Sequence, residues 1–257
     1  MKDFLRYLYY YLFKTVIMQQ INNFERKKAN KKYGKIENLH GCREGERCFI
    51  VATGPSLSID DLNLLKSEFC FSVNTIYRVF KDTEWRPDIY GTQDREIFQK
   101  IKNDIVYYRK ELGDIFIGDC VGKFDIPAFY YHIDMQKHLI GNNETKFSDN
   151  INRVVYDGFS VTYSMIQVAA YMGFKEIYLL GCDTNYNGPK SHFDGNEDEL
   201  PKGIDKFYDN AIVAYSAAKE FAEEKGISIV NCTRGGMLEV FQRQSLEEVL
   251  SAKERKT

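Results

Sequence analysis

The feature that most constrains the fold is an alternation of short apolar segments with helix-like segments between residues 47 and 252. Continuous apolar runs bounded by turn residues predict strands at 47–52, 69–74, 88–92, 114–118, 176–181 and 227–231. Helical spacing of apolar residues predicts helices at 60–66, 160–172, 206–225 and 245–252. Buried strands that alternate with helices are typical of a mostly parallel sheet covered on both faces. We therefore predict an α/β fold.

The chain divides into an appended segment, residues 1–34, and one α/β domain, residues 35–257. The first eighteen residues are rich in aromatic and apolar side chains, but Arg6 and Lys14 make them a poor membrane span. They also lack the cleavage site of a secretory signal. A basic run at 26–32 follows. We expect an amphipathic helical segment that lies on an anionic membrane surface or packs on this protein or a second subunit.

Overall charge and cysteine usage narrow the functional classes. The net charge of −2 excludes a general polyanion binder, so we expect no nucleic-acid partner. None of the six cysteines forms a Cys-x-x-Cys pair or a cluster with zinc-ligand spacing. We expect buried, reduced thiols, no metal site, and a cytoplasmic protein that is peripheral on the inner face of the cytoplasmic membrane if residues 1–34 bind lipid.

Polar residues follow four of the predicted strands, at the sheet edge where ligands bind in parallel sheets. The turn at 53–56 reads Thr53-Gly54-Pro55-Ser56, and such a turn can present amide groups to a phosphate. It matches neither a Walker loop nor a dinucleotide fingerprint, so alone it is a weak signal. Asn74 can contact a nucleotide or satisfy loop backbone. The Gln93-Asp94 pair offers a ribose or metal contact, or a cap for the next helix.

The loop after the strand at 176–181 is the richest in polar residues. It carries Asp183, Asn185, His192 and Asp194. Asp183 is placed to reach a substrate hydroxyl or a metal ion. A histidine is neutral near pH 7 and can accept a proton, which makes His192 a candidate base.

These elements together resemble a known family. Gly-Pro-Ser-Leu follows the first strand, an Asn follows the second, and a Ser/Thr-led helix precedes Gly-Phe-Lys-Glu-Ile-Tyr-Leu-Leu-Gly-Cys-Asp. Over residues 47–249 this order resembles the bacterial lipooligosaccharide sialyltransferase superfamily. It also resembles the wider set of hydroxymethylpterin diphosphokinase-like proteins, which includes flagellin nonulosonate transferases; the segment 231–243 looks like that wider set. The resemblance implies a Rossmann-like nucleotide-binding domain of a variant glycosyltransferase-A type.

The resemblance also implies roles for the residues that match. Gly54, Pro55 and Ser56 fall on the donor-phosphate turn, and Asn74 falls on a cytidine contact. Ser160 and Thr162 flank a helix start that approaches the nucleotide, and Asp183 falls on the acidic residue after the strand.

Two departures separate this chain from sialyltransferases of the well-known type. Asn185 and Ser191 stand where that type has phosphate-binding tyrosines. No histidine lies in 201–207, where that type has its general base. The wider set often has a His-Phe pair after the loop, and His192-Phe193 matches it. His192 is therefore the first candidate base, and Asp194 and Asp205 are the next candidates.

The resemblance implies a glycosyltransferase with a nucleotide-sugar donor, such as a CMP-linked acidic sugar, and a glycan or lipid-linked acceptor. It would act in bacterial surface polysaccharide, lipooligosaccharide or glycoprotein synthesis and need no cofactor. The chain could also act as a homo-oligomer, and the sequence leaves this alternative open. One alternative is a Mg²⁺-dependent diphosphokinase with Asp94, Asp183 and Asp194 as ligands. A catalytically degenerate assembly partner is the other.

Overall fold

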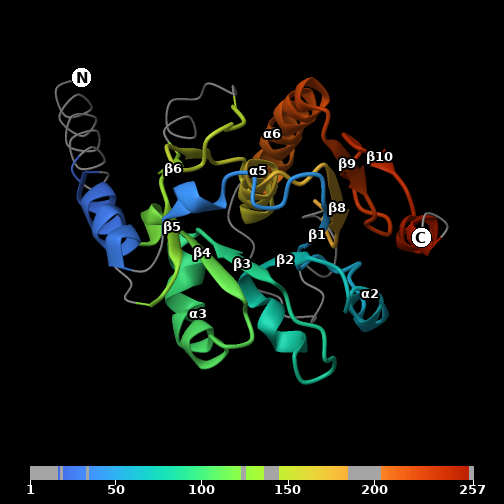
Figure 1. Cartoon of the computed structure of the whole chain (residues 1–257), viewed down its shortest axis with the longest axis horizontal. Helices are drawn as coiled ribbons and strands as arrows, with labels where there is room; N and C mark the ends of the chain where they lie inside the picture. Colours follow the sequence, from blue (N-terminus) through green and yellow to red (C-terminus); the bar gives the residue numbers. More distant parts are fainter. Residues whose placement is uncertain are drawn as a thin grey trace.

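The structure is a computed structural model that describes residues 17, 20–32, 35–122, 126–135, 145–184 and 204–254, with backbone alone at 204–207, 253 and 254. Within these residues, eight parallel strands form one sheet in the order β10-β9-β8-β1-β2-β3-β4-β5 (Figure 1). They are β1 (Arg47–Val51), β2 (Cys70–Val73), β3 (Ile89–Thr92), β4 (Asp114–Gly118), β5 (Phe129–Tyr131), β8 (Glu176–Leu180), β9 (Ser228–Asn231) and β10 (Gln242–Arg243). A separate parallel pair joins β6 (Ile133–Asp134) to β7 (Val155–Tyr156).

The chain reverses its direction of travel across the sheet between β1 and β8. From β1 it winds outward to β5, then returns to the other side of β1 at β8 and continues outward to β10. Val51 pairs with Leu180, so β1 and β8 end at the same level. In open α/β sheets the ligand crevice lies beyond the carboxyl ends of the strands at such a switch point. The topology therefore predicts a ligand site at the loops after β1 and β8.

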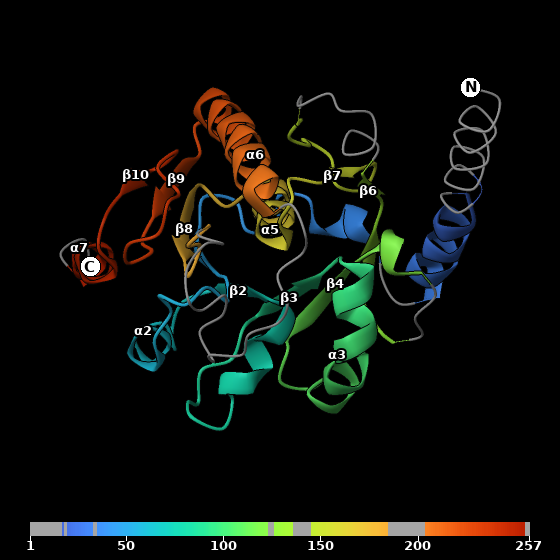
Figure 2. The ribbon, with the colours of Figure 1, turned by 180° about the vertical axis from the view of Figure 1, so that it is seen from behind.

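Helices cover both faces of the sheet, as the sequence predicts (Figure 2). One face packs α5 (Val161–Met172) and α6 (Ile204–Lys225) over Ile50, Phe71 and Phe116. The other face packs α2 (Ile59–Leu64), α3 (Arg95–Tyr107) and α7 (Leu246–Glu254) over residues that include Phe49 and Tyr90. Three 3₁₀ helices complete this part of the chain: η1 (Ile36–Leu39), η2 (Asn74–Val79) and η3 (Asp119–Val121).

Local sequence signals explain where the helices begin and end. Ser58 caps α2 in a capping box with Asp61, whose side chain accepts a hydrogen bond from the Ser58 amide. Ser160 caps α5. Gly173 ends that helix with φ +98°, a conformation that suits glycine. The six predicted strands and four predicted helices are present, and their ends shift by one or two residues. The sequence prediction missed α3, β5, β10 and the β6–β7 pair.

A helix over residues 20–32 lies beside β5, the edge strand of the sheet (Figure 1). Asn30 hydrogen-bonds the backbone of Tyr130 in that strand. Among the helices in the described part of the chain, none is both long enough and apolar enough to cross a membrane.

Candidate functional site

The fold brings the turn after β1 against the loop after β8. The Ser56 hydroxyl donates a hydrogen bond of 2.8 Å to Oδ2 of Asp183, 127 residues away in the sequence. The Ser56 amide lies 3.4 Å from the same oxygen. The Gly54 amide donates to the Gly181 carbonyl at 2.9 Å. Two segments that the sequence singles out for separate reasons therefore meet at the switch point.

Gly54 is required by this close approach. A Cβ at this position would lie 2.0 Å from Oδ2 of Asp183 and 2.3 Å from the Gly181 carbonyl oxygen. Real Cβ atoms do not make contacts that short, and the Gly181 oxygen belongs to the backbone and cannot rotate away. Only a residue without a side chain lets β1 and β8 continue into these loops side by side.

The Asp183 carboxyl group is largely shielded from water. Its residue is 8% exposed. Burial raises the pKa of the Asp183 carboxyl, while the hydrogen bonds from Ser56 and the positive charge of Arg243 lower it in part. A carboxylate held at a desolvated strand end is a common property of ligand-binding and catalytic sites.

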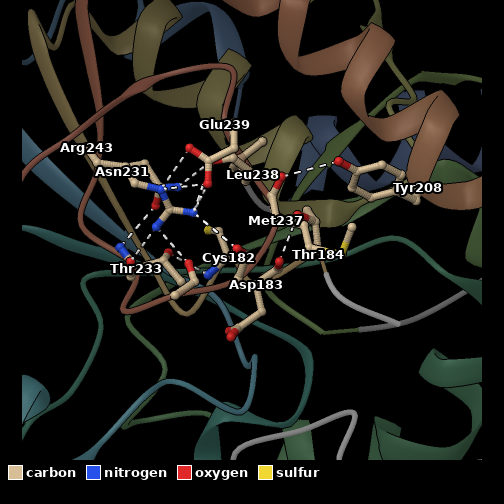
Figure 3. Close-up of polar contacts among 12 residues, drawn as sticks. Cys182, Asp183, Thr184, Tyr208, Asn231, Thr233, Met237, Leu238, Glu239 and Arg243 are labelled. Carbon is tan, nitrogen blue, oxygen red and sulfur yellow. Dashed lines mark hydrogen bonds and ion pairs between the residues drawn. The ribbon is translucent and has the colours of Figure 1, made fainter. Parts of the chain in front are cut away.

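Arg243 organises the loop after β9, which lies next to Asp183 (Figure 3). Its guanidinium donates hydrogen bonds to the carbonyls of Thr233 at 2.9 Å and Gly235 at 2.7 Å. It also forms an ion pair with Glu239 at 2.8 Å. One planar group with five donors can thus fold a loop whose carbonyls point inward.

The folded loop supports Asp183 through its backbone. The Met237 amide donates to the Asp183 carbonyl at 2.8 Å. Gly236, with φ +73°, lies so close that a Cβ there would be 2.7 Å from the same oxygen. Thr233 accepts a hydrogen bond from the Cys182 amide at 3.0 Å. Arg243 is therefore a positioning residue for Asp183 in the geometry of this site.

The Gly54 and Ser56 amides of the turn are engaged within the protein. The Gly54 amide binds Gly181, the Ser56 amide faces Asp183, and Pro55 has no N–H. Thr53 is buried. A phosphate that binds at this turn has to take the Ser56 hydroxyl and amide from Asp183.

Asn74 lies at the end of β2, at the same edge of the sheet. It has φ +46°, a region that asparagine adopts more readily than most residues. Its side-chain oxygen accepts from the Thr92 hydroxyl at 3.3 Å, and its carbonyl accepts from the Tyr90 hydroxyl at 2.7 Å. The side chain is half-buried rather than enclosed.

Gln93 is the centre of a buried hydrogen-bond network. Its side-chain oxygen accepts from Ser164 at 2.6 Å and Tyr131 at 3.0 Å, and its nitrogen donates to Asp157 at 3.1 Å. The network links the end of β3 to α5 and β5, so Gln93 has a structural role.

Three further candidates have roles at helix starts. Asp94 accepts from the Ile97 amide at 2.8 Å and caps α3, the alternative to a ribose or metal contact. Ser160 accepts from the Thr162 amide at 3.2 Å and caps α5. Thr162 is buried in the first turn of that helix.

Comparison with known proteins identifies the family. The family model for "6-hydroxymethylpterin diphosphokinase MptE-like" proteins matches residues 19–189, more than half of the chain. The chain belongs to the MptE-like family. This confirms the resemblance to the wider set that the sequence motifs indicate. No curated protein matches the sequence significantly.

A solved structure confirms the α/β fold of this MptE-like chain. A Maf glycosyltransferase from Magnetospirillum magneticum AMB-1 superposes with a TM-score of 0.52 and 16% identity, over 92% of this chain. The MptE-like chain spans 41% of the length of that protein. The sialyltransferase CstII from Campylobacter jejuni, solved with cytidine-5'-monophosphate, gives a TM-score of 0.47 and 17% identity over 79% of this chain and 86% of its own. At these identities the likeness concerns the fold.

Several predicted site residues of the MptE-like chain lie outside the described residues. They are Asn185, Ser191, His192 and Asp194. Asp205 falls at the start of α6, where the backbone alone is described. Their roles stay predictions.

The sequence prediction missed a His–Asp pair at the same edge of the sheet. Nδ1 of His132 lies 2.8 Å from Oδ2 of Asp119, and Oδ1 accepts from the Ile133 amide at 3.2 Å. Asp119 directly follows β4 and His132 directly follows β5. The strand-end rule would have found them had β5 been predicted. Four strand spacings, about 19 Å, separate β4 from β8, so His132 and Asp183 cannot act on one bond.

Among the described residues, no group of three His, Cys, Asp or Glu side chains could hold a metal ion. The six cysteines are free, and Cys48, Cys70, Cys182 and Cys232 are buried. Burial raises the pKa of each of these four thiols, so they are kept protonated and unreactive.

Proposed function

We propose that this MptE-like chain is a glycosyltransferase whose nucleotide-sugar donor binds between the loops after β1 and β8. The observation that carries the proposal is the contact between Ser56 and the shielded Asp183 carboxyl, beside the bare backbone of Gly54. The fold likeness to a protein described as a glycosyltransferase, over 92% of this chain, supports the same class. We expect the donor to be a CMP-linked acidic sugar used in surface polysaccharide, lipooligosaccharide or glycoprotein synthesis.

In the proposed reaction, a hydroxyl of a glycan or lipid-linked acceptor attacks the anomeric carbon of the donor. His192 takes the hydroxyl proton as the new C–O bond forms. The bond from the anomeric carbon to the phosphate breaks, and the nucleotide leaves with the bonding electrons. The Ser56 hydroxyl and amide exchange their hydrogen bonds with Asp183 for hydrogen bonds to the departing phosphate, whose charge they stabilise. The Asp183 carboxyl then accepts a hydrogen bond from a substrate hydroxyl.

A panel of nucleotides tests the donor class. CMP, UDP, GDP and ATP are each added, with and without Mg²⁺, and unfolding is followed by thermal shift. We expect CMP to raise the melting temperature without Mg²⁺. At a hundred times its dissociation constant a ligand adds about 2.7 kcal/mol, or roughly 5–10 °C for a chain of this size.

Two other results of the panel would contradict the proposal. ATP binding and turnover that strictly require Mg²⁺ would identify a diphosphokinase, the activity in the family's name. A failure of all four nucleotides to shift the melting temperature, in a folded protein, would favour the degenerate assembly partner.

Replacing His192 with alanine tests the base. We expect kcat to fall by about 10²–10⁴-fold, the usual range for general base catalysis, with donor binding unchanged. The matched control is His40→Ala, since His40 is exposed and packs edge-on against Tyr171. Near-full activity in His192→Ala would show that His192 is not the general base. If His132→Ala lost activity instead, the reacting bond would lie at the Asp119 pair and not beside Asp183, which would contradict the proposed site.

A further inference from the structure

The helix over residues 20–32 is attached to the domain by a polar face, beside which Ala29 packs against the core. The Asn30 side chain donates to the Tyr130 carbonyl at 2.7 Å and accepts from the Tyr130 amide at 3.0 Å. Arg26, one turn earlier, forms an ion pair with the buried Asp119 at 3.6 Å and donates to Asn23 at 2.7 Å. Asn23, Arg26 and Asn30 are spaced i, i+3 and i+7, so they share one side of the helix.

The opposite side carries apolar residues that are exposed in the described part of the chain. Ile21 and Phe24 are spaced i and i+3 and are 50% and 67% exposed, and the helical residue Ile17 is 40% exposed. At about 100° of rotation per residue, Ile21 and Phe24 point roughly 150° away from the docked side. The helix therefore turns its polar side to the protein and its apolar side to the surroundings.

Exposed lysines continue this apolar side of the helix. Lys28 and Lys31 fall on the same line, at the next two positions of the pattern, and Lys27 and Lys32 flank them. Residues 20–32 contain five basic residues and one acid, Glu25, so the charge of this segment is strongly positive. The rest of the chain is acidic, because the whole sequence has a net charge of −2.

We propose that this outer helix face, made of Ile21, Phe24, Lys27, Lys28 and Lys31, docks on the surface of an anionic lipid bilayer. Apolar side chains on such a helix enter the boundary between headgroups and acyl chains, and lysines beside them pair with anionic headgroups. A second copy of this chain fits less well. A two-fold contact that pairs the two helices in parallel would bring the lysine clusters of both copies together, and like charges repel. An antiparallel pair would place the lysines of each copy against the apolar residues of the other. The polar side, held by Asn30 and Arg26, keeps the domain attached to the docked helix.

Vesicle sedimentation with the full chain tests the proposal. We expect binding to vesicles of phosphatidylcholine mixed with phosphatidylglycerol, and little binding to phosphatidylcholine alone. Each lysine near an anionic surface contributes about fivefold to partitioning. The double variant Lys28→Glu/Lys31→Glu is therefore expected to lower partitioning into anionic vesicles by about 30-fold or more. Raising the salt concentration should weaken the wild-type binding as well.

Matched controls separate this face from general charge and hydrophobicity. Lys100→Glu/Lys219→Glu makes the same charge change at exposed positions on α3 and α6, and should leave binding within about twofold. Phe24→Ser should weaken binding, whereas Val106→Ser, at a 53% exposed position of α3, should not. An unchanged melting temperature shows that each variant is folded.

Three results would overturn the proposal. The wild-type chain could fail to sediment with anionic vesicles. The Lys28→Glu/Lys31→Glu variant could bind as well as its control, which would remove the lysines from the interaction. Analytical ultracentrifugation could show a dimer that Phe24→Ser dissociates while no vesicle binding is seen, which would assign the face to a second copy.

Discussion

Replacing Asp183 with asparagine is expected to lower turnover of the nucleotide-sugar donor about ten- to a hundredfold and to leave the protein at least as stable at neutral pH. The loss follows from the proposed hydrogen bond between the carboxylate and a substrate hydroxyl, since hydrogen bonds to charged groups contribute about 1.5–3 kcal/mol. The amide oxygen of asparagine can still accept from Ser56, so the loops after β1 and β8 stay together.

The pH dependence of stability gives this prediction a definite sign. Burial raises the pKa of Asp183 in the folded protein, so ionising the carboxyl costs folding free energy. That cost is fully present above the folded pKa. It decreases as the pH falls and is absent below the unfolded pKa of about 3.9. The asparagine variant should therefore gain most over the wild type at neutral pH, and the difference should vanish near pH 4.

Thermal unfolding of both proteins across this pH range measures the effect. The control is Asp114→Asn, because Asp114 is exposed at the opposite, amino end of β4. It should change neither turnover nor the pH profile. An Asp183→Asn variant that unfolds at a lower temperature than the wild type at pH 7, with full turnover, would show that the carboxylate is structural.

Replacing Gly54 with alanine is expected to have the second large effect, on stability and on donor binding together. The new Cβ overlaps Oδ2 of Asp183 and the Gly181 carbonyl oxygen, so the two loops must separate and the hydrogen bond between Gly54 and Gly181 is strained. Overpacking of this kind costs about 1–3 kcal/mol, which corresponds to a melting temperature lower by roughly 2–12 °C. A displacement of about 1 Å at a reacting centre can cost about a hundredfold in rate.

Gly45→Ala is the matched control for Gly54→Ala. Gly45 has φ +81°, and no atom lies within 4 Å of the place that a Cβ would take, so alanine there adds backbone strain without overlap. We expect Gly45→Ala to lose some stability and keep full donor affinity. Equal donor affinity in Gly54→Ala and wild type would contradict a ligand site at this turn.

The sheet was predictable because its strands are buried on both faces. Residues such as Phe49 and Ile50 face opposite cores, so the strand reads as a continuous apolar run. The helix α3 was missed although Phe98, Ile101 and Ile105 have helical spacing, because charged residues separate them and its cap, Asp94, resembles a functional residue.

The site was predictable only where it follows a strand end. Gly54 and Asp183 obey that rule. Nothing near Gln93 in the sequence indicates that Ser164 and Tyr131 donate hydrogen bonds to its side chain. These two residues lie 71 and 38 positions away in the sequence. Arg243 supports Asp183 through a loop whose carbonyls converge only in the folded chain. Local pattern identifies which residues lie at the ligand edge, but it does not distinguish those that bind from those that hold the edge together.

The pairing of Asn30 with β5 also protects the protein from self-association. The outer edge of a sheet offers free N–H and C=O groups to any other strand. The carboxamide of Asn30 imitates a peptide group and occupies both groups of Tyr130, at the middle of the three-residue strand. A helix cannot extend a sheet, so the strand ladder ends there. The segment that we assign to the lipid surface thus also serves as a barrier against aggregation.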